Sequence, residues 1–158
     1  MLFYDRSIVS YRSEGALFAS HHESLTVYSS GRYFTEILTD RIQELVSRSG
    51  IRSGLATIVL QHTTSALLLV EHEAGIFVDL QTALEKMAPH DTLYQHHQRG
   101  VDTNGAAHVL SALLNKPVSV PVIDGAVSLG TYQEIMFIDF QEEVVERSVV
   151  VTVMGERQ

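Results

Sequence analysis

The sequence predicts an α+β fold, a single compact domain built mostly from antiparallel strands with about three helices. The chain has 158 residues, about the length of one domain, and 45% of them are apolar, which allows a sizeable core. Short apolar runs of strand length are separated by turn residues along most of the chain. Three further segments have the composition or the apolar spacing of helices. No Pro/Gly/Ser-rich linker, low-complexity tract or repeat divides the chain.

In the first 88 residues we expect four strands and two helices. The strands cover residues 8–11, 25–28, 55–60 and 66–70. The clearer helix covers residues 35–49, where apolar side chains recur at spacings of three and four. Thr35 is its expected N-cap and Gly50 its end. A shorter helix is expected at residues 79–87, ended by Pro89.

The segment 89–108 contains four of the eight histidines and lacks the periodicity of a buried helix or strand. Its Pro, Gly, Asn, Asp and Thr residues indicate a loop. A loop of this length in a compact domain is usually either functional or disordered. An apolar helix is expected at residues 105–114, with Asn104 as its N-cap, directly after the loop. We therefore expect an ordered loop that handles a ligand.

The remaining chain predicts an antiparallel sheet of short strands. The strands are expected at residues 117–122, 127–129, 135–140 and 148–154. Asp124-Gly125, between two apolar runs, favours a type I′ hairpin turn. Glu142, Glu143 and Glu146 predict an acidic, solvated turn before the last strand.

Composition and charge exclude several classes of protein. The formal net charge is −8, which is the opposite of what a nucleic-acid binder requires. No window approaches the roughly 18 uninterrupted apolar residues of a membrane span, and no signal-peptide pattern is present, so no membrane partner is expected. The absence of cysteine excludes disulfides and thiolate ligands, and it fits a cytoplasmic protein.

Three polar patches interrupt apolar strands or lie beside them, at residues 61–65, 96–108 and 130–133. Burying such groups without partners would cost a few kcal/mol each, so they need one another, water or a ligand. His62, His96, Asp102 and His108 supply the imidazole and carboxylate groups that suit zinc or a similar divalent ion. Because their spacing matches no local zinc motif, such a site has to be assembled from distant segments. Hydrogen-bonded core or surface histidines are the alternative.

A second interpretation of the patches is anion binding. The expected helix start at Asn104-Gly105 exposes free N–H groups, and Thr63, Thr64 and Ser65 add hydroxyl donors. Together they would suit a phosphate. Asp102 and the acidity of the chain oppose this unless a cation offsets their charge. The alternative for the hydroxyl residues is simple strand preference followed by a turn.

Five motifs follow one another in the chain: 61–66 (QHTTSA), 71–73 (EHE), 94–96 (YQH), 102–108 (DTNGAAH) and 129–133 (LGTYQ). In this order they resemble the YjbQ-like family, whose members are known as secondary thiamine-phosphate synthases. The resemblance covers roughly residues 25–156. Residues 1–24 resemble a family-variable N-terminal extension packed on the domain, which would then comprise residues 25–158.

The resemblance implies a compact α+β unit that forms homotrimers, with the polar motifs gathered in a pocket near subunit boundaries. It raises the expectation that His62, His96 and His108 hold a divalent metal such as zinc or magnesium, with His97 replacing His96 if the register shifts by one. Glu73 and Asp102 would hold the ion or act as acid and base. The expected substrate-binding residues are Thr63, Thr64, Ser65, Asn104, Gly105, Thr131, Tyr132 and Gln133. Tyr132 stands where family members usually carry Trp.

The function implied by the resemblance is a metal-assisted condensation of a pyrimidine pyrophosphate with a thiazole phosphate. Because this reaction displaces pyrophosphate, a divalent ion that neutralises the leaving group is expected. The alternative is a trimeric protein that binds a metal or a small phosphorylated molecule without turnover. The sequence contains no complete pattern for a covalent nucleophile.

Overall fold

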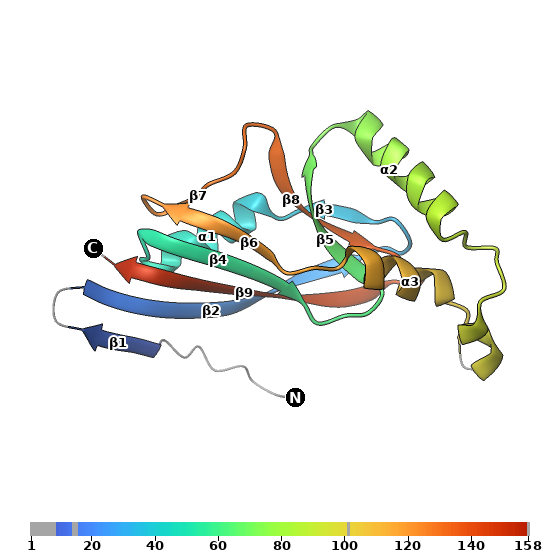
Figure 1. The fold of residues 1–158 in the computed structure, drawn as a ribbon, viewed down its shortest axis with the longest axis horizontal. Coiled ribbons are helices and arrows are strands. Elements are labelled where there is room, and N and C mark those ends of the chain that lie inside the picture. Colours follow the sequence, from blue (N-terminus) through green and yellow to red (C-terminus); the bar gives the residue numbers. More distant parts are fainter. Residues whose placement is uncertain (1–8, 14–15, 101, 158) are drawn as a thin grey trace.

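The computed structural model describes residues 9–13, 16–100 and 102–157, which form two antiparallel sheets and three α-helices, as predicted (Figure 1). The strands are β1 Val9–Ser13, β2 Ala16–Ser29, β3 Thr35–Ile37, β4 Ser53–Leu60, β5 Ser65–Glu71, β6 Val118–Ile123, β7 Ala126–Val127, β8 Gln133–Asp139 and β9 Val145–Arg157. The helices are α1 Thr39–Ser49, α2 Ala74–Met87, α3 Gly105–Leu114 and the short 3-10 helix η1 Gln95–Arg99. None of the described helices is long and apolar enough to cross a membrane.

The larger sheet has the strand order β1-β2-β9-β4-β6-β7. Its long central pair, β2 with β9, runs from Leu17 opposite Arg157 to Ser29 opposite Val145. Strand β2 is therefore continuous across residue 24, where the extension was expected to end. Residue 8, the first residue of the first expected strand, lies outside the described residues.

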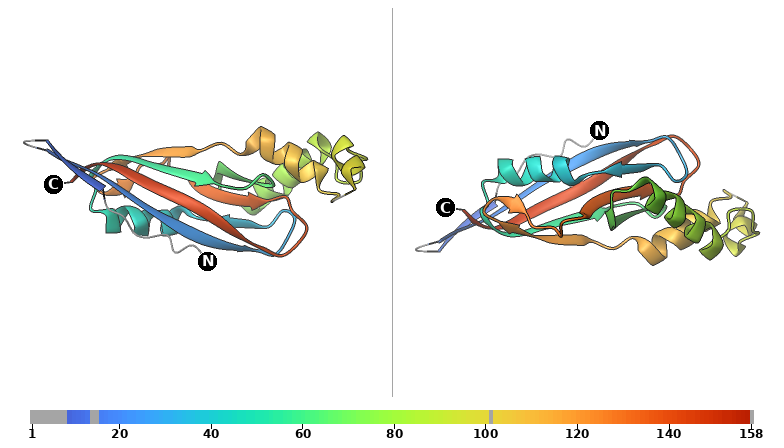
Figure 2. Two further views of the ribbon diagram at one scale, coloured as in Figure 1. Left: turned by 90° about the horizontal axis from the view of Figure 1, so that it is seen from below. Right: turned by 90° about the horizontal axis from the view of Figure 1, so that it is seen from above.

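The smaller sheet, β3-β8-β5, lies between the larger sheet and two helices (Figure 2). Successive side chains of a strand point to opposite faces, so each strand serves two cores. Leu67 and Phe137 join the core that α1 shares with the larger sheet. Ala66 and Ile138 join a second core with residues of α2 and α3. This arrangement places α3 directly against β5.

The helix predicted at residues 35–49 begins later, at Thr39, and Thr35 is not its N-cap. Residues Thr35–Ile37 instead form β3, which pairs with β8. The main-chain bonds from Asp139 N to Phe34 O and from Leu38 N to Ile135 O hold this segment extended. Pairing with a strand about 100 residues away therefore overrides the local helical spacing. Gly50 ends the helix as predicted, with φ of 69°.

Two other predicted features are confirmed and one is extended. Helix α3 has the predicted bounds, and Asp124 and Gly125 both have positive φ, at 53° and 79°, as a type I′ turn requires. Helix α2 ends at Met87 as predicted but begins at Ala74, five residues before residue 79. Its early start follows from Glu73, whose carboxylate accepts hydrogen bonds from the N–H groups of Gly75 and Ile76.

Candidate functional site

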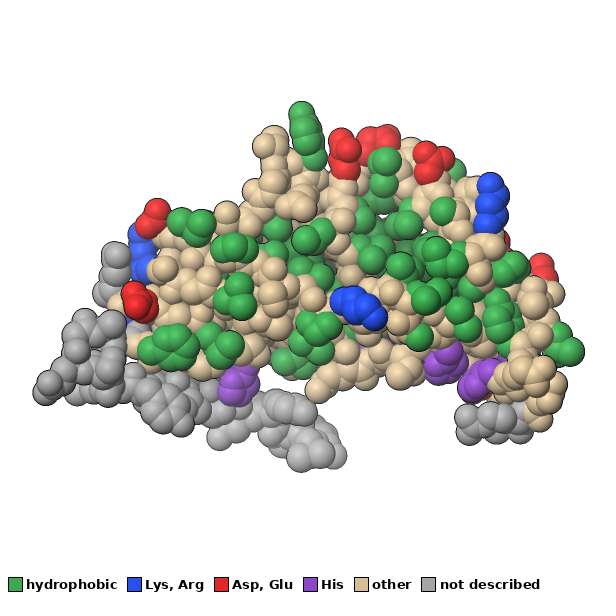
Figure 3. Space-filling view, viewed as in Figure 1, with side chains coloured by type: hydrophobic (Ala, Val, Ile, Leu, Met, Phe, Trp, Pro, Cys, Tyr) green, Lys and Arg blue, Asp and Glu red, His purple; other side chains and the backbone are tan. Residues whose placement is uncertain are grey.

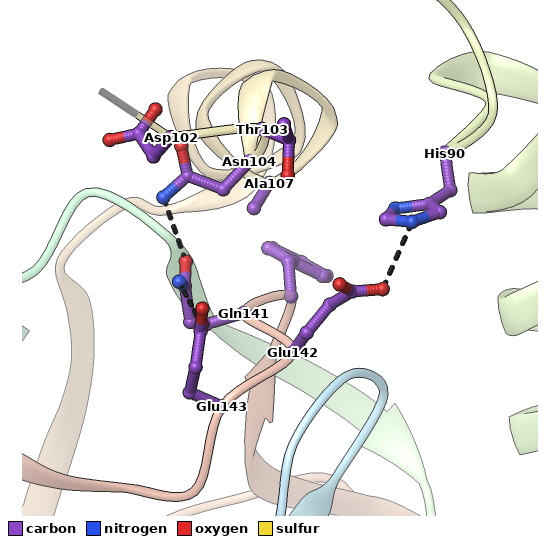
Figure 4. Close-up of a pocket in the computed structure, with 9 residues that line it drawn as sticks. His90, Asp102, Thr103, Asn104, Ala107, Gln141, Glu142 and Glu143 are labelled. Carbon is purple, nitrogen blue, oxygen red and sulfur yellow. Dashed lines mark hydrogen bonds and ion pairs between the residues drawn. The ribbon is translucent and has the colours of Figure 1, made fainter. Parts of the chain in front are cut away.

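A cavity of about 330 Å³ lies at the N-terminal end of α3 (Figure 4). It is lined by His90, Asp102, Thr103, Asn104, Ala107, Phe140, Gln141, Glu142 and Glu143. These residues come from the loop between α2 and α3, from the first turn of α3, and from the turn between β8 and β9. The long loop predicted to handle a ligand therefore forms one wall of a polar recess at α3.

The loop is held in place by contacts with the start of α3. His97 Nε2 accepts a hydrogen bond from Gly105 N at 3.2 Å, and the ring of Tyr94 packs edge-on against that of His97. A β carbon at position 105 would lie 2.6 Å from Tyr94 Cβ, so only glycine permits this approach. The hydroxyl of Tyr94 donates to Pro89 O and closes the loop. These contacts give the loop the ordered structure expected from the sequence.

A buried ion pair holds the opposite wall. Arg147 donates two hydrogen bonds to Asp139, at 2.7 and 2.8 Å, and one to Thr64 Oγ1 at 3.0 Å. Asp139 is fully buried, and its Oδ1 also accepts from Gln141 N at 2.9 Å. The pair thereby fixes Gln141, the second residue of the β8–β9 turn, which is followed by Glu142 and Glu143. A bidentate, buried pair of this kind is geometrically well defined.

The cavity is rich in acceptors and poor in donors. Its polar contacts are His90 Nε2 to Glu142 Oε1 at 2.9 Å, Asn104 Nδ2 to Gln141 Oε1 at 2.9 Å, and Gln141 Nε2 to Glu143 (Figure 4). Asn104 Oδ1 is buried and accepts no hydrogen bond within the described structure. Three carboxylates line the same space, including Asp102. Such a lining suits a cation or N–H donors of a ligand, and it disfavours a bare phosphate.

Beside the cavity, His96, Asp102 and His108 come together. His96 Nε2 lies 2.7 Å from Asp102 Oδ1, and the rings of His96 and His108 lie 4.8 Å apart between centroids. His96 Nε2 is buried, yet its short contact with Asp102 does not have the direction of a hydrogen bond. Within the described residues, no three His, Asp or Glu side chains form a complete group able to hold a metal ion.

His62 lies apart from this cluster. Its Nε2 accepts a hydrogen bond from Ser148 N at 2.9 Å, and its backbone oxygen accepts from Asn115 Nδ2. Asn115 follows His108 by seven residues, which corresponds to about 10 Å along a helix axis. Burial, followed by the nearby Arg147 guanidinium, lowers the pKa of His62. One chain therefore does not bring His62 to His96 and His108.

Most of the hydroxyl residues expected to bind substrate are already hydrogen-bonded within the protein or are buried. Thr64 Oγ1 accepts from Arg147, and Thr64 and Ser65 are both buried. Ser65 Oγ has no hydrogen-bond partner in the described structure, while its backbone oxygen accepts from Ser111 Oγ. Thr63 is exposed. These residues support the network behind the cavity, and none of them lines it.

The remaining residues expected to bind substrate, Thr131–Gln133, and the expected catalytic residue Glu73 lie at the far end of the smaller sheet. Ser65 pairs with Asp139 at one end of β5, and Glu71 pairs with Gln133 at the other. This separation is about 20 Å for a strand of this length. Thr131, Tyr132 and Gln133 are exposed there, and Gln133 Oε1 accepts from Gly130 N. Glu73 follows Glu71 and caps α2 with both carboxylate oxygens, and these two hydrogen bonds lower its pKa.

Sequence reasoning missed His90, the turn residues Gln141, Glu142 and Glu143, and the buried pair behind them. The turn was interpreted as a solvated connection, and Glu142 and Glu143 are indeed exposed. However, a polar run directly after the apolar segment 135–140 is the same signal that identified residues 61–65. The partner of Asp139 could not be found in this way, because Arg147 stands in an alternating strand.

The sequence of this chain is similar to those of known proteins. The family model described as UPF0047 protein YjbQ-like matches residues 23–156. A UPF0047 protein of Synechocystis sp. is 30% identical over 146 residues, covering 91% of this chain and 98% of its own length. A UPF0047 protein of Archaeoglobus fulgidus is 34% identical over 126 residues, covering 80% and 96% of the two chains.

Solved structures show the same fold. A YbjQ-like protein of unknown function from Sulfolobus solfataricus P2 superposes with a TM-score of 0.83 at 26% identity, covering 88% of this chain and 99% of that one. A hypothetical protein from Aeropyrum pernix K1 has a TM-score of 0.78 at 26% identity, covering 86% and 99%.

Proposed function

The chain belongs to the UPF0047 YjbQ-like family, and from this premise we propose that it is a metal-assisted transferase of the secondary thiamine-phosphate synthase type. The reaction joins a pyrimidine pyrophosphate to a thiazole phosphate in the cavity at the start of α3. The observation that carries this proposal is that carboxylates, one imidazole and a helix N-terminus line one recess, with His96 and His108 beside it. Acidic side chains and a phosphorylated substrate are compatible in one site only if a cation lies between them.

His96, Asp102 and His108 have the donor types that suit a divalent ion such as zinc or magnesium, although the described residues of one chain form no complete ligand group. His96 Nε2 is buried, and its 2.7 Å contact with Asp102 Oδ1 lacks the direction of a hydrogen bond, so these two atoms would suit neighbouring ligands of one ion. His108, beside His96, is the third proposed ligand. The bound ion would neutralise charge on the pyrophosphate leaving group.

The chain's own residues would bind and orient the substrates. The N–H groups of Ala106 and Ala107 belong to the first turn of α3, which has no intrahelical partners for them, and they suit a phosphate oxygen. Asn104 Oδ1 lacks a donor and would accept from an amino group of the pyrimidine. The exposed Glu142 and Glu143 would accept from further donors at the cavity mouth.

A homotrimer would unite the two separated groups of motif residues. Thr131–Gln133 and the cavity lie at opposite ends of the smaller sheet of one chain, so they can share a site only between chains. Helices α2 and α3 also expose large apolar side chains: Met87 and Leu113 are each more than half exposed, at 54% and 55%. Figure 3 shows hydrophobic side chains gathered over this half of the molecule. Light scattering during size exclusion should report about three times the 17.6 kDa chain mass, and a monomer at all concentrations would refute the trimer.

Pyrophosphate release tests the transferase directly. The full chain, a pyrimidine pyrophosphate, a thiazole phosphate and Mg²⁺ or Zn²⁺ should release pyrophosphate and form thiamine phosphate. We expect Asp102→Asn to reduce the rate at least about 100-fold and to lower metal content, because it removes a charged ligand. Asp91→Asn is the matched control, since Asp91 is exposed on the same loop and does not line the cavity.

The same experiment separates the two candidate functions. Metal and phosphorylated ligand retained without pyrophosphate release would favour the trimeric binding protein. A metal content unaffected by both His96→Asn and His108→Asn would refute the ligand assignment. His72→Asn serves as the histidine control, because His72 is exposed and stacks on Phe77 of α2.

A further inference from the structure

A second cavity, of about 560 Å³, lies between α2 and the segment that joins β2 to β3. It is lined by Arg32, Tyr33, Val78, Gln81, Thr82, Glu85 and Lys86. It shares no lining residue with the cavity at α3. Its volume falls in the range of small-molecule sites, roughly 300–1,000 Å³.

Tyr33 forms a fixed aromatic wall of this second cavity. Its φ is +61°, a left-handed conformation that a bulky residue rarely adopts and that costs conformational energy. Three contacts hold it there: Tyr33 N donates to Asp139 O at 2.7 Å, the hydroxyl donates to Glu85 Oε2 at 2.8 Å, and the ring packs edge-on against Phe140. Strain of this kind is often found where a side chain must be presented to a ligand.

The charges around the cavity favour an anion, although the chain as a whole carries −8. The Arg32 guanidinium lies 5.5 Å from the centre of the Tyr33 ring and 3.9 Å from Glu85 Oε2. Lys86 is exposed, and no hydrogen bond or ion pair engages it in the described structure. Glu85 is the single carboxylate of the lining, and its oxygens already accept from Tyr33 and from His90 N. Two cations therefore face one carboxylate, and each oxygen of that carboxylate already accepts a hydrogen bond.

We propose that this cavity binds a small organic anion, a phosphate monoester or carboxylate attached to a flat apolar body. Arg32 and Lys86 bind the charged group, since a guanidinium matches the planar pair of oxygens and an ammonium adds a point charge. The Tyr33 ring and the side chain of Val78, which is 63% exposed, contact the apolar body. Neither cation belongs to the proposed metal site.

The proposal is tested by titrating the full ¹⁵N-labelled chain with phenyl phosphate and recording the amide chemical shifts by NMR. The buffer contains a chelator, so that the proposed metal-dependent site does not contribute. We expect saturable shifts in the amides of Tyr33, Thr82 and Lys86, with dissociation constants near about 1 mM. Inorganic phosphate, which lacks the apolar body, should bind at least about threefold more weakly.

Two variants and one control complete the test. Arg32→Gln and Lys86→Gln should each weaken phenyl phosphate about three- to tenfold, as expected for an exposed charge contact. Lys116→Gln should have no effect, because Lys116 lies at the end of α3 and donates to Ala112 O. Equal melting temperatures would show that the variants fold. The proposal is overturned by no saturable shift up to tens of millimolar, by shifts confined to Asn104 and Gln141, or by unchanged binding in both variants. Pyrophosphate release is measured separately with metal, so either proposal can fail without the other.

Discussion

Asp139 and Glu142 stand three residues apart, at the end of β8 and in the turn that follows, but their surroundings are opposite. Asp139 is fully buried, and both its oxygens accept hydrogen bonds from Arg147. The side chain of Glu142 is 55% exposed, and in the described structure it forms an ion pair with His90 across the cavity. The buried region has matched donors and acceptors, whereas the cavity rim has acceptors in excess. The buried pair is therefore expected to contribute to stability, whereas the acceptors at the rim have capacity left for further donors.

Breaking the buried pair should have the largest effect. Arg147→Met leaves the Asp139 carboxylate buried and unpaired, and we expect the free energy of unfolding to fall by about 3–5 kcal/mol. Urea unfolding measures this loss. Glu142→Gln, the matched change at the rim, should cost less than about 1 kcal/mol. Similar losses in the two variants would show that the two regions do not differ in this way.

Disrupting the packing of the loop against α3 should have the second-largest effect. In Gly105→Ala the new β carbon would lie 2.6 Å from Tyr94 Cβ, so the loop must move away from the helix. We expect a loss of about 1–3 kcal/mol, together with weaker metal retention, because His96 and Asp102 stand on the same loop. At Gly130 a β carbon would meet only the flexible side chain of Gln133, so Gly130→Ala is the control. Equal stability of both variants would contradict the tight packing.

Substituting Glu73 tests whether this residue, which was expected to be catalytic, serves mainly as the N-cap of α2. Glu73→Ala should lower the melting temperature modestly at neutral pH and leave metal content unchanged. The two N–H hydrogen bonds lower the pKa of Glu73 in the folded protein, so its stabilising effect is present above its unfolded pKa. That effect disappears as the pH falls through the lowered value. The difference in melting temperature between wild type and variant should therefore shrink at acidic pH. A loss of metal in the variant would support the catalytic role predicted for Glu73.

The smallest expected effect concerns His62, which accepts from Ser148 N as a neutral imidazole. Because its pKa is lowered in the folded state, the unfolded state binds more protons as the pH falls below about 6.5. The wild type should then lose stability relative to His62→Gln, whose side-chain oxygen also accepts. If the melting temperatures of the wild type and of His62→Gln changed equally between pH 7.5 and 5, this account would be wrong.

Local features of the sequence determined the elements that depend on neighbours within a few residues. The bounds of α3 follow from apolar spacing, and the end of α1 at Gly50 and the turn at Asp124-Gly125 follow from the ease with which glycine and aspartate adopt positive φ. The patches at residues 61–65 and 96–108 were correctly identified as segments with polar groups in need of partners, because their side chains interrupt apolar runs.

Only the tertiary structure decided which partners those groups have. The pairing of β3 with β8 made a strand where the spacing favoured a helix, and the bond from Ser148 to His62 joins residues 86 positions apart. The buried pair of Asp139 with Arg147 positions the turn that lines the cavity, and its two residues come from different strands, β8 and β9. Periodicity and turn chemistry act within one segment, whereas a buried polar group is satisfied by whichever segment the fold brings beside it. For this reason the sequence indicated the residue types of the site, and the packing of the sheets determined which of them meet.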